Sequence, residues 1–170
     1  YITGWDLARK FTYTVGVTLD VTEKPYQLVA FERFKDRDWN DVYAAIRRRK
    51  QIYGGRVVVD STGLGDVVIS EIADIGPEGF NFGRGGGKAK TELLSNMEIY
   101  HAKKEIAYPF LEQTGSDGEY WSNLQEFREA SWDTEISGDF IMALGLALWP
   151  LRLSAGEMER KPVDPRLSRV

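Results

Sequence analysis

The sequence predicts an α/β domain in which a mixed β-sheet is flanked by helices, and three observations lead to this fold class. Residues 13–22 alternate apolar and polar side chains, the pattern of a half-buried strand, and a Glu-Lys-Pro turn follows. Residues 56–60 read Arg-Val-Val-Val-Asp, an unbroken apolar run typical of a central strand covered on both faces. Residues 39–53, which lie between these two segments, carry apolar side chains at helical spacing.

The first half of the chain is predicted to hold three antiparallel strands and one helix. The strands are expected at residues 2–7, 13–22 and 26–34, because their short connections favour an antiparallel meander. Asp38 has the character of an N-cap for a helix over residues 39–53, which Gly54-Gly55 ends. The basic run at residues 47–50 is expected to be a solvated face of this helix, with nucleic-acid contact as the secondary hypothesis.

The second half of the chain alternates strands and helices. The expected elements are a central strand at 56–60, a helix at 66–75, a short strand marked by Phe80 and Phe82, a helix at 88–104, an edge strand at 106–110 and a helix at 138–153. The last helix is apolar on nearly all sides, which predicts that it is buried. Residues 111–137 favour loops around a short helix or hairpin.

We therefore expect one domain at residues 1–153, followed by a loose C-terminal tail at residues 154–170. Its length of 170 residues suits a single core, and no apolar stretch approaches the roughly 18 residues of a membrane span. The chain begins at Tyr1 rather than Met, which suggests a piece of a longer protein.

The composition limits the chemistry that the chain can perform. There are no cysteines and one histidine, His101, for which a plain surface position is expected. Any metal site should therefore consist of oxygen ligands, which favour magnesium, manganese or calcium. The net charge of −4 argues against a strong stand-alone nucleic-acid binder, although local basic clusters can still contact phosphate.

Three aspartates stand where one metal site would use them. Asp6 lies inside the apolar first strand, although aspartate is depleted in strands, and Asp60 ends the most apolar strand. Asp139 lies in the first turn of the buried helix, where the helix dipole stabilises a negative charge. The strands with Asp6 and Asp60 are expected to be neighbours, and converging carboxylates repel one another unless cations neutralise them.

Each acid also has a plain structural interpretation. Asp60 is suited to begin an Asx-type turn in Asp-Ser-Thr-Gly, and Asp139 to be a helix-start charge beside the cap residue Ser137. Asp6 is within reach of an ion pair with Arg9. The metal-site hypothesis depends on the three acids taken together.

Three segments resemble the nuclease domain of viral (bacteriophage) terminase large subunits. They read Gly-Trp-Asp-Leu-Ala-Arg at 4–9, Val-Val-Asp-Ser-Thr-Gly-Leu-Gly-Asp at 58–66 and Gly-Asp-Phe-Ile-Met-Ala-Leu at 138–144. The connecting part follows the family's order too, with Phe82, Glu92-Leu93-Leu94, Ile106-Ala107-Tyr108-Pro109 and Leu124-Gln125-Glu126-Phe127. The resemblance covers residues 1 to about 150 and implies an RNase H-like fold.

The resemblance implies an endodeoxyribonuclease whose catalytic and metal-binding acids are Asp6, Asp60 and Asp139. We expect hydrolysis with two ions of Mg²⁺ or Mn²⁺, with Asp6 bridging both ions and the other two acids each holding one side. The family often carries further acids where this chain has Gly138 and Met142, which puts a fourth metal ligand in doubt. The possible auxiliary acids nearby are Asp133 and Glu135.

The implied substrate is double-stranded DNA, cut with little sequence preference and contacted through its phosphates. The candidate DNA contacts are Arg9, Arg84, Lys88 and Lys90. The implied partners are an upstream ATPase domain of the same polypeptide, the portal and the small terminase subunit, acting in the host cell cytoplasm at the procapsid. The 170 residues hold no Walker motif, so we expect no ATP hydrolysis from them alone.

Other functions fit parts of the sequence. Residues 60–65 also resemble phosphate loops of actin-like and sugar kinases, but those enzymes need two such lobes. The stretch from Gly83 to Lys90 fails the P-loop pattern, because Phe82 occupies the first glycine position and Ala89 follows the lysine. A Holliday-junction resolvase or integrase of the same fold is the nearest rival. A non-catalytic adaptor that binds no metal is the least favoured.

Overall fold

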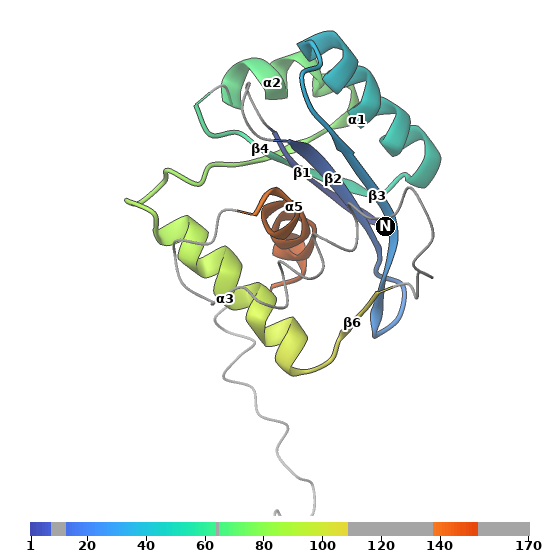
Figure 1. The fold of residues 1–170 in the computed structure, drawn as a ribbon, viewed down its shortest axis with the longest axis vertical. Helices are drawn as coiled ribbons and strands as arrows, with labels where there is room; N and C mark the ends of the chain where they lie inside the picture. Colours follow the sequence, from blue (N-terminus) through green and yellow to red (C-terminus); the bar gives the residue numbers. More distant parts are fainter. Residues whose placement is uncertain (8–12, 64, 109–137, 153–170) are drawn as a thin grey trace, which may run out of the picture.

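The computed structural model describes residues 1–7, 13–63, 65–108 and 138–152, which form a six-stranded mixed sheet with helices on both faces (Figure 1). The strands are β1 (Ile2–Asp6), β2 (Thr14–Asp20), β3 (Tyr26–Phe34), β4 (Arg56–Asp60), β5 (Glu78–Phe80) and β6 (Ile106–Ala107). The helices are α1 (Trp39–Tyr53), α2 (Gly65–Glu71), α3 (Lys88–Ala102) and α5 (Asp139–Leu148). Short 3-10 turns follow α2 at Ala73–Ile75 and α5 at Trp149–Leu151.

The sheet combines an antiparallel half and a parallel half. Its strand order is β5-β4-β1-β2-β3-β6, with β1, β2 and β3 antiparallel to their neighbours in that meander. Strand β4 runs parallel to both β1 and β5, and β6 runs parallel to β3 at the opposite edge. The predicted mixed sheet is therefore confirmed, as is the prediction that the strands carrying Asp6 and Asp60 are adjacent.

The helices form separate layers on the two faces of the sheet. Figure 1 shows α1 and α2 over one face, α5 against the other, and α3 outside α5. On the α1 face the core is built around Trp5, Ile46 and Ile72. On the α5 face, side chains of β2 pack against α5 and α3, with Phe140 at the centre.

Helix α5 is the buried centre of its layer. All residues from Phe140 to Leu148 are buried, which confirms the prediction made from their uniform apolarity. The helix lies so close to β1 that a Cβ added at Gly4 would stand 2.1 Å from the Ala143 carbonyl oxygen and 2.5 Å from the Ala147 nitrogen. A second glycine, Gly145, admits the Leu93 side chain of α3. Because these two positions are glycines, without side chains, the layers can pack this closely.

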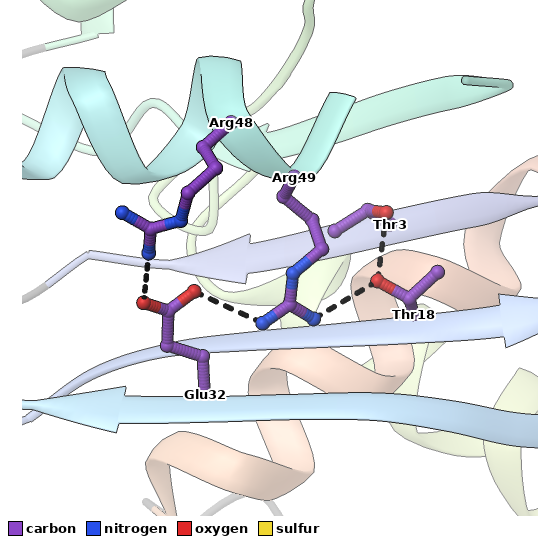
Figure 2. Close-up of polar contacts among 5 residues, drawn as sticks. All are labelled: Thr3, Thr18, Glu32, Arg48 and Arg49. Atoms are coloured by element: carbon purple, nitrogen blue, oxygen red, sulfur yellow. Dashed lines mark hydrogen bonds and ion pairs between the residues drawn. The ribbon is translucent and has the colours of Figure 1, made fainter. Parts of the chain in front are cut away.

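The basic run in α1 forms an ion-pair network in which Arg48 stays exposed, and the expected solvated face is corrected only at the buried Arg49 (Figure 2). Arg49 is only 7% exposed, and its guanidinium donates to Glu32 at 2.9 Å and to the Thr18 hydroxyl at 3.2 Å. Arg48 donates to the same Glu32 carboxylate at 2.6 Å. Since Thr18 also bonds Thr3 at 3.0 Å, the network ties α1 to three strands.

Most predicted boundaries agree with the structure, and α1 agrees at both ends. Asp38 accepts a hydrogen bond from the Asp41 N–H, and Gly54 ends the helix with a positive φ of 64°. The short strand ends at Phe80, because the Phe82 N–H donates to the Thr62 hydroxyl instead of to a strand. The helix predicted at 138–153 gives way to a 3-10 turn at Trp149 that contains Pro150.

In the first half, β1 and β2 are each slightly shorter than the strands predicted at 2–7 and 13–22, and further differences lie in the second half of the chain. The helix predicted at 66–75 is α2 plus a 3-10 turn, which Gly76 ends in the left-handed conformation. His101 is partly buried, which corrects its expected surface position. Its Nδ1–H donates to the Met97 carbonyl at 2.8 Å, its Nε2 lies 2.6 Å from the Tyr108 hydroxyl, and burial lowers its pKa.

Several predictions concern residues outside the described ranges. These are the loops and short element at 111–137, the end of the edge strand at 109–110 and the tail at 154–170. In the described part of the chain, no helix is both long and apolar enough to cross a membrane.

We predict that Gly4→Ala destabilises the fold strongly. The new methyl group would meet backbone atoms of α5, which cannot rotate away, so the cost should be about 3 kcal/mol or more, at or above the upper end of ordinary overpacking. Denaturant unfolding measures the change. Gly83→Ala is the matched control, since its Cβ would meet the Asn81 side chain at 3.3 Å. Equal stability of the two variants would contradict the prediction.

Candidate functional site

Two of the three predicted acids lie side by side at one end of the sheet. Asp6 is the last residue of β1 and Asp60 the last of β4, and these strands are parallel with Trp5 beside Val59. Their side chains project from the α5 face, because alternate residues change face and the preceding Trp5 and Val59 pack in the α1-face core. This is the carboxyl edge of the parallel strands, where α/β sheets commonly hold ligands.

The third acid reaches the same edge from α5. Asp139 is the first residue of that helix, and its Oδ2 accepts a hydrogen bond from the Tyr13 N–H at 2.9 Å. Tyr13 stands just before β2, the neighbour of β1, where Asp6 is opposite Val15. The backbone of β2 therefore holds the Asp139 carboxylate over the end of the sheet.

The electrostatics of the three carboxylates show that they share one small region. Burial raises the pKa of Asp6 well above its ordinary value, and the negative charges of Asp60 and Asp139 raise it further. Burial also raises the pKa of Asp60 and of Asp139, against the lowering effect of their hydrogen bonds to Thr62 and Tyr13 respectively. Asp6 is the acid on which the repulsion of the other two acts.

A divalent cation fits this donor set. A positive charge beside Asp6 would relieve the repulsion that Asp60 and Asp139 exert on its carboxylate, and oxygen donors suit hard cations. Within the described ranges, no three Asp, Glu or His side chains already stand close enough to chelate one ion together. Asp60 and Asp139 each accept a hydrogen bond from a backbone N–H, that of Thr62 and that of Tyr13 respectively.

The plain interpretation of Asp60 is also correct. Its Oδ1 accepts a hydrogen bond from the Thr62 N–H at 2.8 Å, which is the predicted Asx-type turn. The turn and a metal role are compatible, because the same hydrogen bond holds the carboxylate at the sheet edge. The N-cap residue of α5 is Gly138, which has no side chain with which to cap the helix. The Asp139 carboxylate is held by the Tyr13 N–H.

The predicted basic and auxiliary residues divide into three groups. Lys90, in the first turn of α3, lowers the pKa of Asp6 by its positive charge and so lies near the acids. Arg84 and Lys88 are exposed in and after the glycine-rich loop, and Lys88 stands 3.8 Å from Glu92. Arg9, Asp133 and Glu135 lie outside the described residues.

Sequence reasoning missed one basic residue on this face, Arg33 of β3. It stands opposite Val15, which in turn stands opposite Asp6, so the three residues form one row across neighbouring strands. Its positive charge acts to lower the pKa of Asp139. A usable signal was the alternation in β3, in which Phe31 contacts the core and Arg33, two residues on, must share its face.

This combination of sheet order, flanking helices and acids at the end of β1 and β4 defines an RNase H-like domain. No protein-family model matches the chain. The large terminase subunit of Thermus virus P23-45 is 27% identical over 110 residues, which cover 64% of this chain and 22% of that relative. The large terminase subunit of Thermus phage G20c is 26% identical over 110 residues, which again cover 64% of this chain and 22% of that relative. The chain thus spans about a fifth of the length of these curated relatives.

Solved structures agree with the sequence matches. The large terminase nuclease of thermophilic phage G20c with bound zinc has a TM-score of 0.68 and 25% identity, covering 88% of this chain and 80% of that one. The match to the human cytomegalovirus terminase nuclease domain, manganese-soaked and inhibitor-bound, covers 92% of this chain and 85% of that one, with a TM-score of 0.50. Its 12% identity makes it a likeness of fold alone. The predicted resemblance to terminase nuclease domains and the RNase H-like fold are confirmed.

We predict that Asp6→Asn raises the melting temperature of the metal-free chain at pH 7. The folded pKa of Asp6 lies above the unfolded value of about 3.9, so ionisation destabilises the fold as the pH rises through the folded pKa. The gain should disappear as the pH falls toward about 4, where wild-type Asp6 is protonated. Thermal melts in EDTA between pH 4 and 7 measure this gain. Each kcal/mol of added unfolding free energy should raise the melting temperature by about 2–4 °C.

A control variant should change the melting temperature in the opposite direction. The Arg47 guanidinium lowers the pKa of Asp74, so Asp74→Asn should lower the melting temperature at pH 7. A lower melting temperature for Asp6→Asn at pH 7 would contradict the repulsion among the three acids.

Proposed function

We propose that this chain is a metal-dependent endonuclease that hydrolyses double-stranded DNA with little sequence preference. The observation that carries the proposal is the gathering of Asp6, Asp60 and Asp139 at one sheet edge, with the pKa of Asp6 raised by the other two. The likeness to terminase nuclease domains, one of them with bound magnesium and one with bound zinc, supports the same chemistry.

The three acids have distinct proposed roles. Asp6 carries the repulsion of both other acids, which favours it as the residue shared by two ions, with Asp60 and Asp139 each holding one side. Bound Mg²⁺ or Mn²⁺ supplies acidification of water and neutralisation of charge on a leaving oxygen. Lys90 offers a positive charge beside the acids for a DNA phosphate. Asp133 and Glu135 remain predicted auxiliary acids, and Arg9, Arg84 and Lys88 remain predicted DNA contacts.

The wider biological role follows from the names of the relatives. Both curated relatives are large terminase subunits, and this chain matches about a fifth of each. We propose that it acts in viral genome packaging, joined to an upstream ATPase domain and working with the portal and the small subunit at the procapsid in the host cytoplasm. The boundary between a nuclease domain at 1–153 and a tail at 154–170 is part of the same proposal.

A cleavage assay tests the proposal. We expect the wild-type chain to cut linear duplex DNA in Mg²⁺ or Mn²⁺ and not in EDTA, and Asp6→Asn to abolish cutting because it removes the shared ligand. Asp20→Asn is the matched control: the same change in the same sheet, but at the far end of β2, where the half-buried Asp20 accepts hydrogen bonds from Thr22.

Two results would contradict the assignment. Full activity of Asp6→Asn would exclude the metal role of that acid. Strong preference for four-way junctions over linear duplex would favour the resolvase hypothesis, since the substrate is what separates these two enzymes.

A further inference from the structure

Arg33 lies on the same face of the sheet as the three acids, two strands away from Asp6. The row Asp6, Val15 and Arg33 crosses three adjacent strands, and residues directly opposite each other project from the same face. Two strand spacings separate Asp6 from Arg33 along this row, roughly 10 Å. An anion held by Arg33 would therefore be a different group from one held at Asp6.

One nitrogen of the Arg33 guanidinium lacks a partner in the part of the chain that the structure describes. That nitrogen is Nε, which is buried and has no hydrogen-bond partner among the described residues. Arg47, Arg49 and Arg56, in contrast, each donate to a carboxylate at 3.2 Å or less. Leaving a buried donor unpaired costs about 1–3 kcal/mol, so the position of Arg33 calls for an explanation.

Tyr13 contacts both Arg33 and the acid Asp139. The centre of the guanidinium lies 3.6 Å from the centre of the Tyr13 ring, while the Tyr13 N–H holds the Asp139 carboxylate at 2.9 Å. One residue thus binds both groups, the cation by its ring and the anion by its backbone. Stacking on an aromatic face leaves the edge of a guanidinium, with its donors, directed to the side.

A second cation extends the same surface. The Lys35 ammonium, two residues further along the chain and exposed, lies 5.6 Å from the centre of the Tyr13 ring. Because Arg33 and Lys35 both approach Tyr13, positive charge gathers beside the acids on the α5 face. Planar guanidinium groups bind phosphate with two parallel hydrogen bonds, which suits this geometry.

We propose that Arg33, stacked on Tyr13, binds a backbone phosphate of the DNA strand next to the phosphodiester held at the acids. This inference rests on the proposed nuclease function and adds a positioning contact to it. Arg33 fixes where the strand lies on the sheet and takes no part in breaking the bond.

Salt-dependent binding tests the contact without cleavage. The dissociation constant of a linear duplex is measured in EDTA over a series of salt concentrations for the wild-type chain, Arg33→Gln, Arg33→Lys and Arg47→Gln. Loss of one phosphate contact should reduce the slope of log Kd against log salt by about 0.9 in Arg33→Gln. Arg33→Lys should keep the slope and bind more weakly, because lysine keeps the charge without the planar fork. Arg47→Gln, which removes the same charge from the α1 layer, should keep the wild-type slope.

A second measurement uses the unaltered chain. A dicarbonyl reagent that modifies arginine is applied with and without duplex, and the modified positions are mapped by mass spectrometry. Arg33 should be protected by DNA and Arg47 should not. This result decides the question even where Arg33→Gln does not fold.

Each outcome has one meaning. A folded Arg33→Gln with the wild-type slope and affinity, or equal modification of Arg33 with and without DNA, overturns the contact. Metal-dependent cleavage by the wild-type chain is scored separately, so that cleavage with an unchanged slope overturns Arg33 alone. A reduced slope in the absence of any cleavage supports the Arg33 contact and overturns the nuclease.

Discussion

The contact between α5 and β1 is the constraint on which the rest of the structure depends. Gly4 has no side chain, so the α5 backbone lies directly on the strand, and any Cβ there would collide with Ala143 and Ala147. Asp139 begins α5 and Asp6 ends β1, so their separation follows from this one close approach. A larger residue at position 4 would move the helix outward and with it the acid. The site is therefore a consequence of backbone packing, as well as of the choice of acidic residues.

The close contact between α5 and β1 also has an electrostatic cost. Burial and the charges of Asp60 and Asp139 raise the pKa of Asp6, so at neutral pH the fold carries a repulsion that its apolar core must offset. The core has the means to do so, because α5 is buried along nearly its whole length between the sheet and α3. Strain of this kind is characteristic of functional sites, where stability is reduced locally in return for affinity for a ligand.

Local signals predicted much of the fold, and they failed where tertiary contacts decide. The ends of α1 were predictable because Asp38 caps it and Gly54 ends it, both through neighbouring backbone. The end of β5 was not, because the Phe82 N–H is taken by Thr62, twenty positions earlier in the chain. The three acids were identified by position within apolar segments and by resemblance. Arg33 was missed because the alternation in β3 gives only its face, whereas its place in one row with Asp6 and beside Tyr13 follows from the pairing of β3 with β2 and of β2 with β1.

The arrangement of charge on the two faces resolves the apparent conflict between a net charge of −4 and a nucleic-acid substrate. On the α1 side, the basic run is partly neutralised within the protein, since Arg47 pairs with Asp74 and both Arg48 and Arg49 pair with the single carboxylate of Glu32. The run is therefore a weaker basic patch than its sequence suggests. On the α5 side, the acids repel one another, and the nearby cations Lys90 and Arg33 act on them only through space. A divalent ion bound there would reduce the negative charge of this face, leaving Lys90, Arg33 and Lys35 around it. Attraction of phosphate to this face should therefore increase once a metal is bound.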